Sequence, residues 1–229
     1  MASSRFPGKP LVDIGGLPLV VRSARRAIAA NCFAKVVVAT EDQVIVDVCS
    51  RHDLESILTP TFPTGTDRVA WAAQQLQRPW VINLQGDEPV FPLELLRDLC
   101  DLLPTDPTAL WTAADTGLTA ADRTDDDVVK IELGDGDPAD GLDFFRTLPA
   151  DGGSRNFAIH VGVYGGSLEA LSRFAALPIP ALETDRRIEP LRALANGMPV
   201  RARKGTWARA AIDRREHIST VLRMLEGVT

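Results

Sequence analysis

The sequence predicts an α/β fold in which a mostly parallel β-sheet carries helices on both of its faces. Runs of β-branched residues alternate with segments of helical periodicity over residues 1–115, which is typical of such folds. The run AKVVVAT, 34–40, is β-branched and uninterrupted, as expected for a buried parallel strand. Apolar residues make up 45% of the 229, enough for a substantial core.

The first half of the chain supplies four helices and four strands in alternation. Apolar residues at helical spacing predict the helices, with Thr64 as a good N-cap and Pro92 at a first turn. The expected helices are 18–31, 41–53, 64–77 and 92–103, and the expected strands are 34–40, 55–60, 80–85 and 109–115.

After residue 115 the pattern changes to short strands separated by Gly/Asp turns. Residues 116–165 therefore predict an antiparallel β excursion carried on the sheet. Two helices (167–176 and 181–196), a strand at MPVRARK and a last helix at 213–227 follow, and Pro190 should kink the second helix or end a turn. Since no repeat or linker is found, residues 1–229 are expected to form a single domain.

Composition excludes several classes of protein. A net charge of −6 argues against a nucleic-acid binder with a basic patch, although small anionic ligands stay possible. The three cysteines, Cys32, Cys49 and Cys100, lack metal-site spacing and predict reduced thiols in the cytoplasm. No apolar run has the length of a membrane span, and no signal sequence follows Met1.

The opening segment, SSRFPGKPL, combines cations with a glycine. Arg5 and Lys9 bracket Pro7-Gly8, so backbone N–H groups and two positive charges could hold a polyphosphate. The spacing is not that of a P-loop. The alternative is a basic, flexible N-terminus.

Two acidic residues are candidate metal ligands. Asp87 follows a buried strand in LQGDEP, where a carboxylate suits Mg²⁺, although a capped strand-to-helix turn is the alternative. Asp213 precedes the last helix and forms a capping-box pattern with Glu216, and a cap can also be a metal ligand.

Two further segments carry polar groups of interest. His160 and Tyr164 are an even number of residues apart, so on a strand they share one face, although a lone strand histidine is often structural. The segment LETDRRIEPLR, 182–192, predicts a charged helix that is either solvated or a subunit contact.

Taken in order, these motifs resemble the 3-deoxy-manno-octulosonate (Kdo) cytidylyltransferase family, the CMP-Kdo synthetases. The resemblance covers nearly the whole chain and rests on SSRFPGKPL, TGTDR, LQGDEP, DVVKI, HVGVYG, LETDRRIEPLR and the late Ile-Asp pair. It implies a Rossmann-like nucleotidyltransferase sheet, a homodimer in the cytoplasm and a role in lipopolysaccharide biosynthesis. The implied reaction joins CTP to a 2-keto sugar acid with Mg²⁺ and releases pyrophosphate.

The resemblance also implies roles for particular residues. Lys9, Asp87 and Asp213 would be catalytic, with Asp87 and Asp213 holding the metal. The expected nucleotide-binding residues are Ser3, Arg5, Lys9, Thr64, Gly65, Arg68 and Gln85, and the expected acceptor-binding residues are Gln85, Arg146, His160, Tyr164 and Glu189.

Some positions depart from the family pattern. Ile159 replaces a usual arginine, Pro190 a usual glutamine and Arg186 a usual acid, all on the acceptor side. A non-sugar acid or a phosphonate is therefore an alternative acceptor, and a non-catalytic nucleotide-binding relative is a further alternative.

In the family a central strand ending in Pro-Ala-Arg comes before the opening loop. We therefore expect that the natural protein begins about ten residues earlier and that this chain lacks the first central strand, which would leave sheet edges unpaired.

Overall fold

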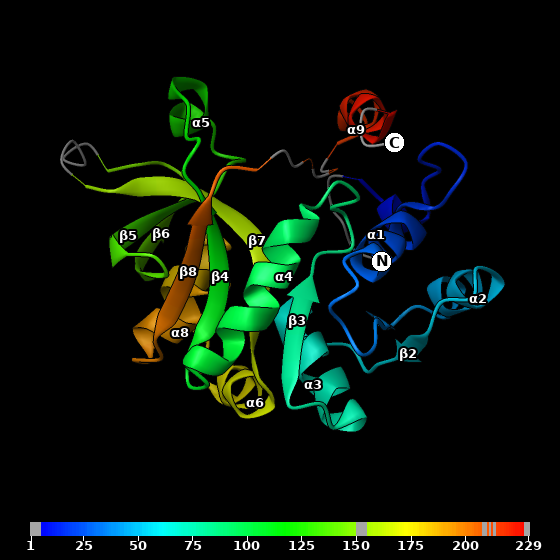
Figure 1. Ribbon diagram of the computed structural model, residues 1–229, viewed down its shortest axis with the longest axis horizontal. Helices are drawn as coiled ribbons and strands as arrows, with labels where there is room; N and C mark the ends of the chain where they lie inside the picture. Colours follow the sequence, from blue (N-terminus) through cyan, green and yellow to red (C-terminus); the bar gives the residue numbers. More distant parts are fainter. Residues whose placement is uncertain (1–5, 150–154, 208–209, 211, 213, 227–229) are drawn as a thin grey trace. The chain divides into compact units, whose positions relative to one another are not determined.

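The computed structural model describes residues 6–149, 155–207, 210, 212 and 214–226. The chain divides into two compact units, which we treat separately (Figure 1). Unit 1 comprises Met1–Pro63, Leu84–Cys100 and Ala208–Thr229, and unit 2 comprises Thr64–Asn83 and Asp101–Trp207. That the two act as one domain stays a prediction.

Unit 1 is built mainly from helices around a small parallel sheet. Its elements are η1 (Lys9–Leu11), α1 (Leu19–Ala29), β1 (Val38–Thr40), α2 (Gln43–Arg51), β2 (Ser56–Leu58), α9 (His217–Glu226) and most of α4 (Leu93–Leu102). Strands β1 and β2 pair in parallel, with Val38 opposite Ser56. These elements lie where the sequence predicts them, although both strands are shorter. The expectation of a missing first strand is not confirmed.

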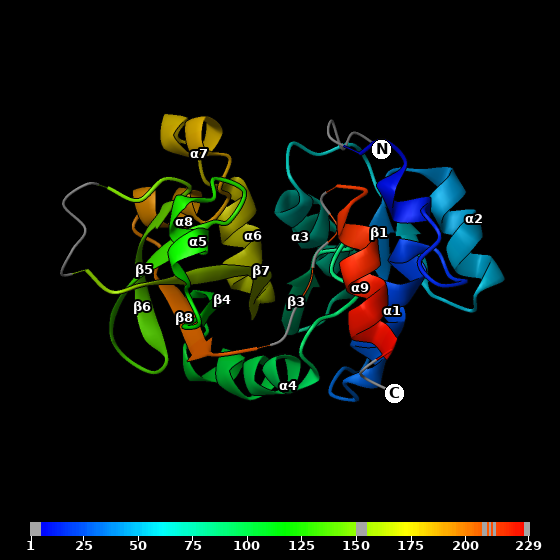
Figure 2. The same ribbon diagram turned by 90° about the horizontal axis from the view of Figure 1, so that it is seen from above.

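The two sides of α1 pack into different apolar clusters. Leu19 contacts a cluster with Phe6 and Val221, so α9 lies along α1 (Figure 2). On the other side, Val20 and Val21 pack with residues of α2. The opening segment is therefore anchored from Phe6 onward, because burial of an aromatic ring in this cluster holds it in place.

Unit 2 contains a six-stranded sheet and the helices that cover it. Its elements are α3 (Gly65–Leu76), β3 (Trp80–Leu84), η2 (Leu103–Thr105), β4 (Leu110–Asp115), α5 (Ala120–Thr124), β5 (Lys130–Gly136), β6 (Ala139–Phe145), β7 (Phe157–Ser167), α6 (Leu168–Ala176), α7 (Ala181–Arg186), α8 (Leu191–Ala195) and β8 (Val200–Gly205). In the described part of the chain, no helix is long and apolar enough to cross a membrane.

The prediction of a mostly parallel sheet is wrong for this unit. The strand order is β3-β7-β4-β8-β6-β5, and β5 also pairs with β7, which closes five strands into a barrel-like ring. Only β4 and β8 run in parallel among the registers described for this sheet, whereas β4–β7, β5–β6, β5–β7 and β6–β8 are antiparallel. The antiparallel excursion predicted at 116–165 is thus part of the main sheet.

The helix predicted at 181–196 is broken into two. Helix α7 ends where Arg187 adopts a left-handed conformation, with φ of 55°, and Pro190 is the N-cap of α8. A proline cannot continue a helix, since its ring clashes with the preceding turn. The expected effect of Pro190 is therefore confirmed.

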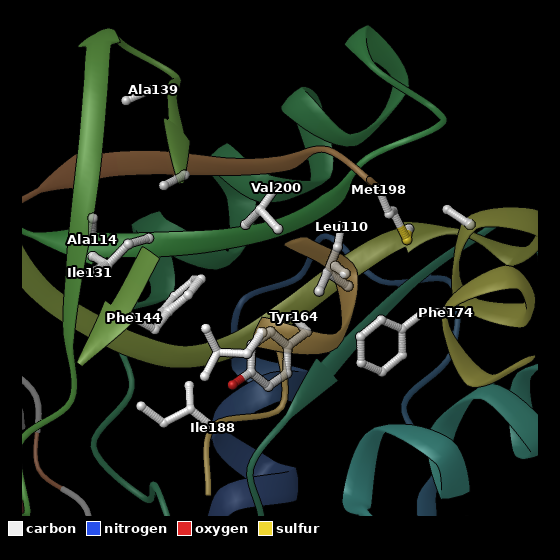
Figure 3. Packing of buried hydrophobic residues seen from close by; sticks show 14 of the residues in the cluster. Leu110, Ala114, Ile131, Ala139, Phe144, Tyr164, Phe174, Ile188, Met198 and Val200 are labelled. Atoms are coloured by element: carbon white, nitrogen blue, oxygen red, sulfur yellow. The ribbon is translucent and has the colours of Figure 1, made fainter. Parts of the chain in front are cut away.

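The main core of unit 2 lies between the sheet and helices α6 and α8. It combines residues of β4, β5, β6, β7 and β8 with Phe174 of α6 and Leu191 of α8. Figure 3 shows the Tyr164 ring within this cluster, between Phe144 and Phe174, with its hydroxyl oxygen on the side of Ile188.

Candidate functional site

The residues predicted for the site fall into three groups. Unit 1 contains Lys9, Gln85 and Asp87, and unit 2 contains Thr64, Gly65, Arg68, Arg146, His160, Tyr164 and Glu189. Ser3, Arg5 and Asp213 lie outside the described residues.

In unit 1, the structure joins two residues that are distant in sequence. Lys9 Nζ donates to Asp87 Oδ2 at 2.5 Å, and the exposed side-chain fractions are 10% for Lys9 and 29% for Asp87. An ammonium and a carboxylate this close neutralise each other, and the partial burial strengthens the attraction. Asp87 is half-buried, so its ion pair with Lys9 differs from the local contacts of an acid in an exposed turn.

The backbone around Lys9 depends on a glycine. Gly8 has φ of 74° and is the N-cap of η1, and the Lys9 amide donates to the Phe6 carbonyl at 3.2 Å. Only glycine adopts this conformation without steric cost, so Gly8 turns the chain and directs Lys9. The buried Phe6 fixes the other side of the turn.

The turn that carries Asp87 is tied to its neighbours by hydrogen bonds. Ser23 Oγ donates to the Gly86 carbonyl at 2.9 Å, and Arg26 Nε donates to the Phe91 carbonyl at 2.7 Å. The Ile212 amide donates to the Asp87 carbonyl at 2.9 Å, so the chain just before Asp213 lies against Asp87. Gln85 is half-buried in the same turn, and its carbonyl accepts from Glu88.

Among the described residues, no group of three or more His, Cys, Asp or Glu side chains could hold a metal ion. One carboxylate together with substrate phosphates is nevertheless a usual donor set for Mg²⁺. Asp87, as a half-buried carboxylate, fits this role chemically.

In unit 2, Thr64 is the N-cap of α3, as the sequence predicts. Its hydroxyl oxygen accepts from the Asp67 amide at 3.2 Å and donates to Asp67 Oδ2 at 2.8 Å. Gly65 begins the helix, and Arg68 lies in its first turn. The start of this helix carries a partial positive charge, which suits an anionic ligand.

The prediction of a solvated or subunit-contacting charged helix at 182–192 is wrong for two of its charges. Arg192 is 1% exposed and is ion-paired to Asp67 at 2.6 Å and to Glu183 at 2.7 Å. Its guanidinium also lies 4.6 Å from the centre of the Phe174 ring. Burial opposes the charge, but the hydrogen bonds that Arg192 donates to Glu183 and Asp67 outweigh it and raise the pKa of Arg192.

This ion-paired triad, Asp67–Glu183–Arg192, was not predicted. The neighbouring sequence did contain a signal, since Arg192 lies within LRALA, an apolar run whose other residues include the buried Leu191 and Ala193. A charged residue in such a run needs buried partners. Its partner Asp67 is 125 residues away, which local patterns cannot reveal.

Glu189 lies next to the triad. Its Oε2 accepts from the Thr66 amide at 3.3 Å, which links the segment between α7 and α8 to the start of α3. Burial raises the pKa of the Glu189 carboxyl, and the Thr66 hydrogen bond only partly opposes the shift. The structure thus brings a predicted acceptor-side residue against the predicted nucleotide-side helix.

Arg146 joins three segments of unit 2 through carbonyl groups. Its Nε donates to the Arg186 carbonyl at 2.8 Å, Nη1 to that of Asp126 at 3.0 Å and Nη2 to that of Arg187 at 3.3 Å. Arginine has five N–H donors, so one on each terminal nitrogen is not used by these bonds. Arg146 therefore has both a structural role and donors left for a ligand.

His160 and Tyr164 lie side by side, as predicted, but for a different reason. Their ring centroids are 5.6 Å apart at an interplanar angle of 26°. On a regular strand, residues four apart would be separated by about 13 Å. The register between β4 and β7 shifts here: Trp111 is opposite Gly165 and Ala113 is opposite Val161. This bulge, rather than even spacing alone, brings the rings together.

Two of the residues that depart from the family pattern, Arg186 and Ile159, have partners within unit 2. Arg186 Nη1 donates to Asp143 at 2.9 Å, and its guanidinium lies 4.8 Å from the centre of the Phe145 ring. Ile159 is 7% exposed and pairs with Lys130 in the sheet. The departure at Arg186 is therefore matched by an acid on β6.

The chain is similar to known cytidylyltransferases. The family described as cytidylyltransferase matches residues 1–133. The 3-deoxy-manno-octulosonate cytidylyltransferase of Parvibaculum lavamentivorans is 38% identical over 207 residues, covering 87% of this chain and 80% of the relative. The enzyme of the same name from Nitratidesulfovibrio vulgaris is 35% identical over 234 residues, covering 98% and 92%.

Solved structures agree with these relatives. A CMP:2-keto-3-deoxy-manno-octonic acid synthetase complexed with CTP superposes with a TM-score of 0.89 at 27% identity, covering 100% of this chain and 95% of that one. A UDP-glucose pyrophosphorylase complexed with UDP-glucose gives a TM-score of 0.66 at 11% identity, covering 99% and 95%. At that identity, the second likeness shows the fold alone.

Proposed function

Because the chain belongs to the 3-deoxy-manno-octulosonate cytidylyltransferase family, we propose that it activates Kdo with CTP. The acid's hydroxyl oxygen forms a bond to the α-phosphorus of CTP, and the bond from that phosphorus to the β-phosphate oxygen breaks. Pyrophosphate leaves, and the hydroxyl proton is released. The observation that carries this proposal is the ion pair between Lys9 of SSRFPGKPL and Asp87 of LQGDEP.

In this proposal, Lys9 acts with Ser3 and Arg5 on the triphosphate. A positive charge held ready beside the phosphates stabilises the charge that develops as pyrophosphate leaves. Asp87 holds the Lys9 ammonium in place, which their 2.5 Å contact supports. Thr64, Gly65, Arg68 and Gln85 would bind the rest of the nucleotide.

Asp87 and Asp213 would hold Mg²⁺. The bound ion would supply positive charge to the triphosphate and lower the pKa of the acceptor hydroxyl. The hydrogen bond from Ile212 to Asp87 supports this pairing, since Ile212 is the residue before Asp213.

Arg146, His160, Tyr164, Glu189 and Gln85 would bind the acid. Arg146 supports this role with the two N–H groups that its carbonyl bonds do not use, because a paired donor set suits a carboxylate. Glu189 is half-buried and would accept from sugar hydroxyls. His160 is held rigidly between aromatic rings, which suits a residue that selects a substrate by shape.

A second candidate is cytidylyl transfer to a non-sugar acid or a phosphonate. Ile159, Arg186 and Pro190 favour it, because all three lie in the segments expected to face the acid. A site that lacks one polar partner for a substrate can reject that substrate strongly.

We further propose that units 1 and 2 act as one catalytic domain and that the protein is a cytoplasmic homodimer serving lipopolysaccharide biosynthesis. The family membership supports these proposals. Light scattering of the purified protein would measure the oligomeric state, and a monomeric mass at working concentration would contradict the dimer.

The test is pyrophosphate release with CTP and Mg²⁺ across a panel that contains Kdo, other keto sugar acids, non-sugar acids and phosphonates. We expect release with Kdo. Release only with another acid would favour the second candidate. No release with any acid would leave a nucleotide-binding relative and overturn the proposal.

Asp87→Asn provides the matched test of the site. We expect a loss of turnover of at least about 100-fold, the usual cost of removing a group that stabilises transition-state charge. Asp47→Asn is the control, since Asp47 is an exposed acid of unit 1 that bonds only to Gln43 in the described contacts. Equal turnover in both variants would contradict the role of Asp87.

A further inference from the structure

The bulge between β4 and β7 contains a buried hydroxyl that the proposed mechanism does not use. One residue of β4, Thr112, lies opposite three residues of β7, Gly162 to Tyr164, because the register shifts between Trp111 and Ala113. Thr112 is 0% exposed. A fully buried hydroxyl must be hydrogen-bonded, since an unsatisfied one is costly.

Among the described residues, the Thr112 hydroxyl contacts two groups, and of these two only the imidazole is able to donate. Its Oγ1 lies 3.0 Å from His160 Nε2 and 3.2 Å from the Val161 carbonyl oxygen. The carbonyl can only accept, whereas an imidazole nitrogen can either donate or accept. A threonine hydroxyl has a single proton, so it cannot donate to both.

The Thr112 hydroxyl must therefore donate its hydrogen bond to the Val161 carbonyl oxygen. In the opposite arrangement, the hydroxyl would donate to His160, and two oxygens without a proton between them would face each other at 3.2 Å in a buried site. With the proton on the carbonyl side, Thr112 Oγ1 accepts from His160, and Nε2 must carry a hydrogen.

Two aromatic contacts of His160 set the plane of its ring. Tyr164 stacks on it at 5.6 Å, and the edge contact with Phe144 has a centroid distance of 5.1 Å and an angle of 87°. These rings set the tilt, and the Thr112 bond sets the rotation within the plane. The ring is thus held in one orientation, with a hydrogen on Nε2.

We propose that Thr112 is a positioning residue that holds neutral His160 in the Nε2–H tautomer, so that Nδ1 is the acceptor nitrogen. The protonated ring also keeps Nε2–H, so proton uptake at Nδ1 does not disturb the Thr112 bond. The kinetic consequence rests on the proposed role of His160 in binding the acid: Thr112 would set which atom His160 presents to that substrate.

The primary test is NMR of ¹⁵N-histidine-labelled protein above the titration of the ring. The chain has three histidines, and the signals lost in His160→Gln identify those of His160. We expect a protonated Nε2 and an unprotonated Nδ1 in the wild type. A spectrum with the hydrogen on Nδ1 would overturn the proposal without any reference to catalysis.

Two variants distinguish the effect of the Thr112 hydroxyl from that of the shape of the side chain. Thr112→Val keeps the volume and removes the acceptor, so the His160 spectrum should shift toward a mixture of tautomers. Thr112→Ser keeps the oxygen and should retain the wild-type pattern. Thr116→Val is the control, because its hydroxyl bonds to Gly205 and Thr206 at the end of the same strand.

The same variants give a kinetic readout. Thr112→Val should raise the KM for the acid about tenfold, which is the effect of one ordinary hydrogen bond, and leave the KM for CTP unchanged. Thr112→Ser should restore the wild-type value. If Thr112→Val kept the wild-type spectrum and the wild-type KM for the acid, the proposal would be overturned. If no acid were turned over, the proposed function would fail while the NMR result stood by itself.

Discussion

Replacing Arg192 with methionine should destabilise unit 2 more than any exchange of a surface arginine. Arg192 holds both Asp67 and Glu183 in a setting where the exposed side-chain fractions are 1%, 8% and 6%. Without the guanidinium, two carboxylates stay buried beside each other with no cation. Removing one partner of a buried ion pair costs about 3–5 kcal/mol, because the remaining charge is uncompensated.

The charges of the triad also predict an asymmetry. Two carboxylates and one guanidinium sum to −1, so Glu183→Gln leaves a balanced pair between Asp67 and Arg192. We therefore expect Glu183→Gln to cost only about 1–2 kcal/mol, mainly from the weaker hydrogen bonds. A triad held together merely by shape would make the two variants equally harmful.

Urea unfolding followed by tryptophan fluorescence is a suitable assay. All four tryptophans, at positions 71, 80, 111 and 207, belong to unit 2, so the signal reports on the unit that contains the triad. In thermal unfolding, the loss for Arg192→Met corresponds to a fall in Tm of roughly 6–20 °C for a chain of this size.

Arg201→Met is the matched control. Arg201 also pairs with two acids, Asp106 and Asp140, but its side chain is 34% exposed. Exposed pairs contribute less than about 1 kcal/mol, because water screens them. If Arg192→Met lost no more stability than Arg201→Met, burial would not govern the strength of these pairs and the reasoning would be refuted.

Two further predictions use the same fluorescence assay. Burial raises the pKa of Glu189, so the folded state binds its proton more tightly than the unfolded state, and stability should fall as pH rises from 4.5 through the raised pKa. Glu189→Gln should flatten that fall. If the pH profile of stability did not change in this variant, the raised pKa would be contradicted. Gly165→Ala would bring a Cβ within 2.9 Å of Leu103 Cδ2 and 3.3 Å of the Val81 carbonyl, and should lower the free energy of unfolding by about 1–3 kcal/mol. Gly134→Ala, whose new Cβ would have its nearest atom at 3.5 Å, should lower it clearly less. Equal losses of stability in the two variants would argue against the close approach at Gly165.

Local features of the fold were predictable because their causes are local. Thr64 caps α3 through the Asp67 amide three residues on, and Pro190 lies at the start of a new helix as its N-cap. Such interactions depend on residues within one turn, so the sequence pattern contains all the information that is needed.

Strand direction was not predictable in the same way. Strand β7 is antiparallel to β4, and β8 lies between β4 and β6, which follows from connections tens of residues long. The apolar pattern of a strand does not depend on the direction in which the strand runs in the sheet. The prediction of a parallel sheet therefore rested on the alternation with helices, and it is wrong for unit 2.

The candidate site shows the same division. The motifs located Lys9 and Asp87 separately, but their pairing joins residues 78 apart. Likewise, even spacing predicted that His160 and Tyr164 share a face, and the bulge that brings them into contact follows from pairing with β4. Motifs identify chemically suitable groups, whereas distant pairing determines which groups meet.

The place of β8 in the sheet has a consequence for how the protein is made. Strand β8 closes the ring by pairing with both β4 and β6, which are otherwise linked through β7 and β5, and among the described strands it is the last to leave the ribosome. Until residue 205 has emerged, the ring of strands stays open and the edges of β4 and β6 that pair with β8 are left unpaired. Assembly of unit 2 during translation therefore waits for its C-terminal strand, and a nascent chain stopped before β8 should be a preferred client of chaperones.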